Sequence, residues 1–225
     1  MRRLNGLWLA VMVVFAAVAA MSLSSAFAAS PLPQILPIEE NQRFTDKSDG
    51  TTRLQLETER RTVVLCRKAT SSGIQETDTL GQFHISFEGC ESSGLRCRSA
   101  GDAAEEVLML GSFHYVYDTL GGNEKVAVLF LPQTTSFECV GIRIEVTGNV
   151  LCLVLRPLEE TRVHLIHCIR GPGAGEQAEK TWWNDNLERQ TAELLTSVSG
   201  GGRERSSELA LAEIIFQRPN AFMND

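Results

Sequence analysis

The chain has 225 residues, of which 43% are hydrophobic and 22% charged, and its formal net charge is −7. This balance is typical of a packed globular protein of one or two domains, and it excludes a wholly disordered chain, a collagen and a coiled coil. The acidic charge argues against a nucleic-acid partner, because phosphate contacts require clustered Lys and Arg side chains.

Residues 1–28 have the three zones of a Sec-type signal peptide. Two arginines follow Met1, residues 7–20 form an uncharged apolar run, and Ala26-Phe27-Ala28 is a signal-peptidase site. The apolar run is shorter than the ~20 residues that span a membrane, which favours cleavage over an uncleaved anchor. Cleavage after residue 28 leaves 197 residues and, because two arginines are lost, a net charge of −9. We therefore predict a secreted, extracellular protein without a membrane span after cleavage.

Residues 29–50 are predicted to form a proline-containing linker or an edge segment. Pro31, Pro33 and Pro37 interrupt regular structure, and Asp46 to Gly50 has the composition of a turn. An edge strand near Phe44 is the alternative for this stretch.

Residues 51–218 are predicted to form a β domain, because apolar and polar residues alternate along much of this stretch. The clearest strand places Phe83, Ile85 and Phe87 on one face, and Gly111-Ser112 suggests a bulge or break between two later strands. Thr147-Gly148-Asn149 is a hairpin signal. The expected strands lie near residues 54–57, 62–66, 82–88, 107–110, 113–117, 126–131, 137–140, 142–146, 150–155, 163–169, 191–197 and 208–216.

Short strands separated by turn residues indicate an all-β fold, a single antiparallel β-barrel or β-sandwich. The chain lacks the strand–helix alternation of a parallel α/β fold. For residues 176–195 the sequence does not decide between a helix and a loop. Helix-forming residues lie on both sides of residues 182–186, and residues 182–186 themselves have a turn-like composition. Residues 219–225 are expected to form a tail.

Six cysteines follow the signal peptide, and an even number in an oxidising compartment predicts disulfide bonds. Cys90 and Cys97 are the favoured pair, because the short Gly- and Ser-rich loop between them suggests a bend closed at its base. Such a closure contributes about 2–3 kcal/mol in the chain-entropy model. The candidates are Cys66, Cys90, Cys97, Cys139, Cys152 and Cys168.

A metal site at His164, His167 and Cys168 is the competing interpretation of the last cysteine. In a strand, residues three apart point to opposite faces, so His164 and His167 are not expected to share an ion. We therefore predict no metal site and no cofactor.

No catalytic motif is present: the chain has no G-x-S-x-G, no H-E-x-x-H, no P-loop and no dinucleotide fingerprint. We assign no catalytic residue, although a secreted hydrolase that uses one of the four histidines is an alternative. Those histidines are His84, His114, His164 and His167.

Trp182 and Trp183 are the candidate binding surface. Exposed indole rings stack on sugars and apolar ligands, and aromatic residues are enriched at interfaces. The alternative is that one or both rings pack at the open end of the β core.

A cysteine motif resembles one found in small, uncharacterised secreted proteins of certain bacteria. It reads G-C-x-S-S-G-x-x-C-x-S-x-G over residues 89–101, with Glu105-Glu106-Val107 after it and a later Gly148-Asn149-Val150 segment. The resemblance implies a secreted, cysteine-containing β protein and brings no catalytic residues with it.

Two functions follow as hypotheses. The first is a non-enzymatic β domain with a binding or structural role at the cell surface or in the medium. The second is a carrier of a small apolar ligand in a closed barrel. An internal apolar cavity favours the carrier, whereas a filled core contradicts it.

Overall fold

The computed structural model describes residues 32–37, 41–48, 53–101, 105–118, 125–184 and 188–223. The chain divides into Met1–Ser30 and Pro31–Asp225; the predicted signal peptide lies outside the described residues, and the following concerns the second unit alone. Its described residues form strands and no helix, so the prediction of an antiparallel all-β fold is confirmed. Accordingly, none of these residues belongs to a helix that could cross a membrane.

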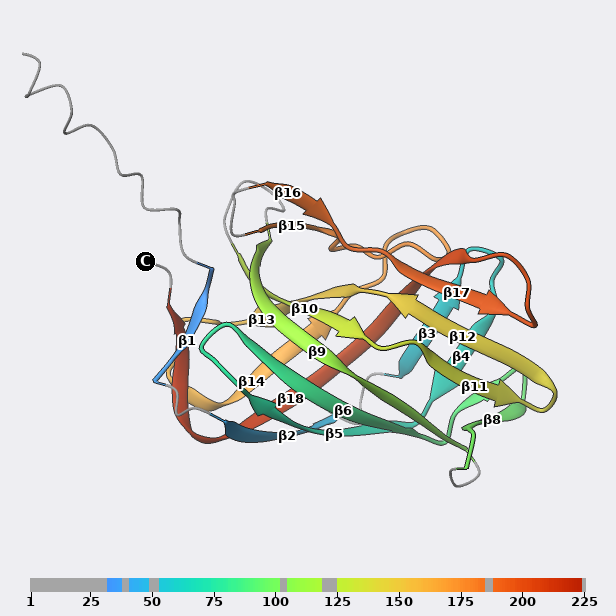
Figure 1. Ribbon diagram of the computed structural model, residues 1–225, viewed down its shortest axis with the longest axis horizontal. Helices are drawn as coiled ribbons and strands as arrows, with labels where there is room; N and C mark the ends of the chain where they lie inside the picture. The colour runs from blue at the N-terminus through green and yellow to red at the C-terminus, as the bar shows by residue number, and fades with distance from the viewer. Residues whose placement is uncertain are drawn as a thin grey trace, which may run out of the picture. The chain divides into compact units, whose positions relative to one another are not determined.

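Eight antiparallel strands close on themselves to form the first barrel (Figure 1). Each strand is hydrogen-bonded to the next, and the last returns to the first, so the ring has no free edge. In order around the barrel these are β2 (Gln42–Ser48), β5 (Lys68–Gln75), β6 (Leu80–Glu88), β9 (Glu106–Asp118), β10 (Lys125–Pro132), β13 (Val150–Leu155), β14 (Thr161–Cys168) and β18 (Glu204–Met223).

The remaining pairings close a second ring, the second barrel, which lies around the right-hand part of β18 in Figure 1. Its narrowest join is between β4 and β7, where only Leu65 and Glu91 are paired. In order the ring contains β18, β3 (Leu54–Thr58), β4 (Val63–Cys66), β7 (Glu91–Ser92), β8 (Leu95–Ser99), β11 (Thr135–Cys139), β12 (Ile142–Gly148) and β17 (Leu194–Val198).

β18 is shared by both barrels. Its first residues pair with β17 and β3, and those from Ala210 onward pair with β14 and β2. Because side chains alternate along a strand, Glu208, Ala210, Ala212, Ile214 and Phe216 share the inward face. The methyl side chains at positions 210 and 212 fill little of the space where the barrels meet.

Each barrel has its own apolar core. The first holds mostly aromatic and branched side chains, among them Phe44, Phe113 and Phe216. Two of these rings lie over glycines of neighbouring strands: a Cβ at Gly81 would lie 2.5 Å from Phe113 Cζ, and one at Gly73 only 2.2 Å from Phe44 Cζ. Close ring packing therefore requires glycine at both positions.

Three shorter strands lie beside the first barrel. β15 pairs with the end of β9 and with β16, and β1 pairs with the end of β18. Their bounds are β1 (Gln34–Leu36), β15 (Thr181–Trp183) and β16 (Arg189–Thr191).

Several predicted boundaries differ from the structure. Residues 42–48 form β2, which is one of the strands of the closed first barrel and not a linker or an edge strand. Residues 219–223 are not a tail but the end of β18, where the side chains of Asn220 and Phe222 are buried. Gly111 causes neither a bulge nor a break, because it pairs in register with Phe83 on β6. Of residues 176–195, those that are described contain parts of three strands and no helix.

All six cysteines form disulfide bonds, but the predicted Cys90–Cys97 bond is wrong. The bonds are Cys66–Cys90, Cys97–Cys139 and Cys152–Cys168. Cys97 and Cys139 are opposed residues of β8 and β11, and each of the other two bonds lies one residue beyond a strand pairing, next to Leu65 with Glu91 and Leu153 with His167.

The strand register explains the pairing. Cys66, Cys90, Cys97 and Cys139 form one row across β4, the segments around β7 and β8, and β11. A Cys90–Cys97 bond would leave Cys66 and Cys139 at the two ends of the row, with no second cysteine of the row beside either. The bonds Cys66–Cys90 and Cys97–Cys139 pair all four.

Candidate functional site

Two apolar cavities lie where the barrels meet. Cavity 1 is in the second barrel, against Val107, Phe137 and Val146, and cavity 2 extends toward the first barrel, against Ala212 and Ile214. The two are neighbours, because five side chains line both: Leu54, Phe87, Met109, Leu194 and Glu208.

Each cavity has the size of a small organic group. The centres of water-sized spheres have about 50 Å³ available in each cavity. By this measure one water needs roughly 10–15 Å³, so each cavity has room for about three to five waters or one ring the size of benzene. A filled core is therefore excluded, although each void is smaller than the roughly 300–1,000 Å³ typical of pockets for drug-sized ligands.

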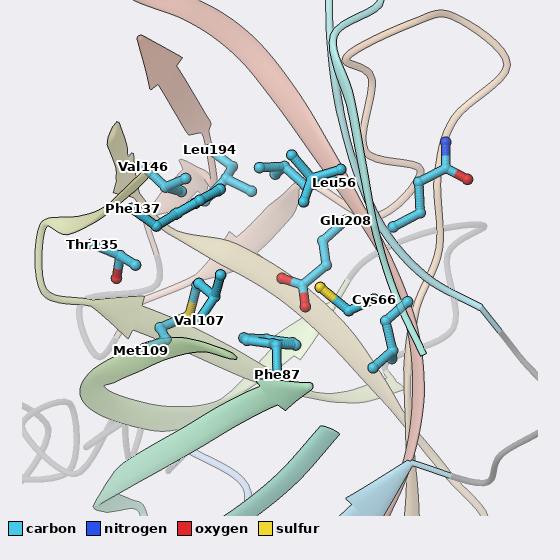
Figure 2. Close-up of a pocket in the computed structure, with 13 residues that line it drawn as sticks. Leu56, Cys66, Phe87, Val107, Met109, Thr135, Phe137, Val146, Leu194 and Glu208 are labelled. Atoms are coloured by element: carbon cyan, nitrogen blue, oxygen red, sulfur yellow. The ribbon is translucent and has the colours of Figure 1, made fainter. Parts of the chain in front are cut away.

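The Glu208 carboxyl group is the main polar feature of both cavities. Figure 2 shows its side chain extending from β18 into cavity 1, with the carboxyl group among Cys66, Val107 and Phe87. No described side chain forms an ion pair or a hydrogen bond with this carboxyl group; the glutamate's two hydrogen bonds to Gln177 both involve its backbone. Burial alone raises the pKa of Glu208 to about 7, because an apolar environment disfavours the charged form.

Asp46 on β2 is the second carboxyl group that lines cavity 2. The Ser71 hydroxyl donates a hydrogen bond of 3.0 Å to Asp46 Oδ2. Burial raises the pKa of Asp46 to about 6; the hydrogen bond from Ser71 opposes this rise, and the charge of Glu213 adds to it. The Asp46 carboxyl group therefore accepts one side-chain hydrogen bond, whereas the Glu208 carboxyl group accepts none from the described side chains.

The two candidate tryptophans have different environments. Trp182 lines an outer hollow on the first barrel, together with Leu32, His114, Leu129 and Asn184, whereas Trp183 is not among its lining residues. The hollow offers about 380 Å³ to the centres of water-sized spheres. Trp182 also packs against the buried apolar cluster that contains Leu129 and Ala192, so its ring lies between this cluster and the hollow.

A buried pair of carboxyl groups lies near Trp182, which is opposite Asp118 in the pairing of β15 and β9. Asp118 is fully buried and Glu179 nearly so. Burial, followed by the charge of Asp118, raises the pKa of Glu179 to about 6. Both Asp118 carboxyl oxygens and Glu179 Oε2 lack a hydrogen-bond partner among the described residues, and burial beside a second carboxyl group favours the protonated form of Glu179.

His164 and His167 lie on opposite faces of β14, as the strand pattern predicted. His164 is buried, and its Nε2 lies 2.7 Å from Asn220 Oδ1, while Cys168 is bonded to Cys152. Burial lowers the pKa of His164, an effect that the hydrogen bonds with Asn220 oppose. Within residues 32–223, as far as they are described, no three His, Cys, Asp or Glu side chains are placed to hold a metal ion.

The hydrolase alternative requires a histidine beside a nucleophile. In the described ranges, none of the four histidines hydrogen-bonds to a Ser, Cys or carboxylate side chain. His84 lies on the exposed face of β6, opposite in direction to Phe83. The described geometry therefore offers no support for this alternative.

Sequence reasoning missed Glu208 as a site residue. The signal was present in the predicted last strand, because Glu208 has the same parity as Ile214 and Phe216 and so faces the core with them. No protein-family model, curated protein or solved structure matches this chain.

Proposed function

We propose that the protein is a secreted, non-enzymatic binding protein that carries a small, largely apolar ligand in cavities 1 and 2. The observation that carries this proposal is the pair of adjacent apolar cavities, with one unpartnered carboxyl group, inside a closed and disulfide-linked fold. Apolar pockets with a few polar groups are typical of small-molecule sites, and barrels commonly contain them.

The size of the cavities limits the ligand. Each accepts a group of about one benzene ring, and because they share five lining residues, a ligand could occupy one or both. Long acyl chains and large ring systems are outside this size. The role is therefore transport or capture of a small compound.

Extracellular location is supported by independent features. Three disulfides are typical of oxidising compartments, and residues 1–28 have a signal-peptide pattern. A carrier in the medium fits the signal-peptide pattern and the disulfides, since disulfide bonds stabilise a protein against unfolding in an oxidising environment.

Titration calorimetry with toluene tests the proposal. We expect toluene to bind the mature protein, and Ala212→Leu, which places a larger side chain in cavity 2, to lower the amount of toluene bound at saturation. The control is Ser72→Leu, which adds the same side chain on the exposed face of β5 and should bind like the wild type. Absence of toluene binding to a folded wild-type protein would contradict the proposal.

A further inference from the structure

Among the described residues, no side chain hydrogen-bonds to the Glu208 carboxyl group or forms an ion pair with it; its hydrogen bonds to Gln177 involve the backbone. Asp46, the other acid of the cavities, accepts a hydrogen bond from Ser71. Buried charges in proteins are normally paired, because an isolated carboxylate loses its hydration without compensation. A bound ligand could supply the missing partner.

The cavity walls define what that partner must be. Among the residues that the structure describes, no Lys, Arg or His lines either cavity, and the groups there that titrate are Glu208 and Asp46, because the lining cysteines are in disulfides. Both titrating groups are acids, so an anionic ligand such as a fatty acid would face like charge. A metal ion lacks a third ligand among the described His, Cys, Asp and Glu side chains.

A protonated amine satisfies each requirement. Its N–H groups donate to the carboxylate, its positive charge compensates the negative one, and charge-assisted hydrogen bonds of this kind are about twice as strong as neutral ones. The apolar part of the same molecule would contact side chains such as Phe87, Met109 and Leu194. The low dielectric of the cavity strengthens the attraction relative to water.

We propose that cavities 1 and 2 select small organic amines, with the ammonium group on the Glu208 carboxylate and an apolar group of about one ring in the cavity. This inference rests on the proposed function, since it assigns the ligand class of that same site. No covalent step is involved.

Matched ligands distinguish the two proposals. Calorimetry at pH 8 compares benzylamine, benzyl alcohol and toluene, which share one ring and differ in the attached group. We expect benzylamine to bind at least tenfold more tightly than benzyl alcohol, and Glu208→Gln to remove this preference while toluene still binds. Glu88→Gln, at an exposed acid paired with Lys68, should keep the wild-type preference.

The affinity for benzylamine should also depend on pH. An alkylamine stays protonated from pH 6 to pH 8, as lysine does, whereas a free Glu208 with a pKa of about 7 ionises across this range. The ionised fraction, and with it the affinity, should rise about tenfold. Asp46, with a pKa of about 6, completes its ionisation mainly at the lower end of the range.

Each outcome decides between the ideas. Equal binding of all three ligands to the wild type would overturn amine selection and leave the carrier function intact. Failure of all three to bind would overturn both. An amine preference that persists in Glu208→Gln but is lost in Trp182→Ala would place the amine in the outer hollow and overturn the inference.

Discussion

An unpaired carboxyl group in an apolar cavity should make the stability of the ligand-free protein depend on pH. The folded state holds the Glu208 proton up to a pKa of about 7, against 4.5 for an ordinary glutamate. Between these values Glu208 binds more protons in the folded protein than in the unfolded chain, so the contribution of this group to stability is greatest below pH 4.5 and is lost as pH rises to 7. At about 1.36 kcal/mol per pKa unit, ionisation of Glu208 lowers the free energy of unfolding by about 3 kcal/mol.

Urea unfolding at pH 4.5, 6 and 8 under non-reducing conditions measures this loss. We expect Glu208→Gln, which cannot ionise, to lose about 3 kcal/mol less than the wild type between pH 4.5 and pH 8. Asp46 and Glu179 contribute equally in both proteins, so the difference isolates Glu208. Glu88→Gln is the control and should follow the wild type. If Glu208→Gln showed the wild-type dependence, the reasoning about Glu208 would be refuted.

Three further predictions concern the fold. Val140 is 65% exposed at a φ of 43°, which is costly for a β-branched residue, so Val140→Asn should stabilise by about 1 kcal/mol in urea unfolding; a destabilised variant would argue against that turn. Asp118→Asn removes the negative charge beside Glu179. Between pH 5 and pH 8, the free energy of unfolding of this variant should fall by on the order of 1 kcal/mol less than that of the wild type; an unchanged pH dependence of unfolding would show that the two acids do not interact. Peptide mapping without reduction should link Cys90 to Cys66; a Cys90–Cys97 link would contradict the strand register.

The all-β class could be predicted because alternation and turn residues are local signals. The strand from Phe83 to Phe87 and the opposed directions of His164 and His167 follow from period-two geometry alone. Barrel closure could not be predicted in this way, because it depends on pairings between distant segments such as β2 with β18. The linker prediction failed for the same reason: prolines mark local interruptions, and they do not show that Phe44 will meet Phe216 in a core.

The disulfide pairing shows a related limit. Closeness in sequence favoured Cys90 with Cys97, and the two do lie opposite each other. The register, however, also places Cys66 beside Cys90 and Cys139 beside Cys97, and the sequence does not reveal these pairings between distant segments. Glu208 was missed because an acid at the start of a predicted strand is usually solvated. The parity of Glu208 with Ile214 and Phe216 gives the direction of its side chain, but only the second ring of strands encloses that side of β18 at this position.

The most direct test of the central claim is a crystal structure of the mature protein with benzylamine. The account predicts the aromatic ring in cavity 1 or cavity 2 and the ammonium nitrogen within hydrogen-bond distance, about 2.7–3.2 Å, of the Glu208 carboxylate. A ligand bound only elsewhere, or cavities that stay empty at saturating benzylamine, would contradict it.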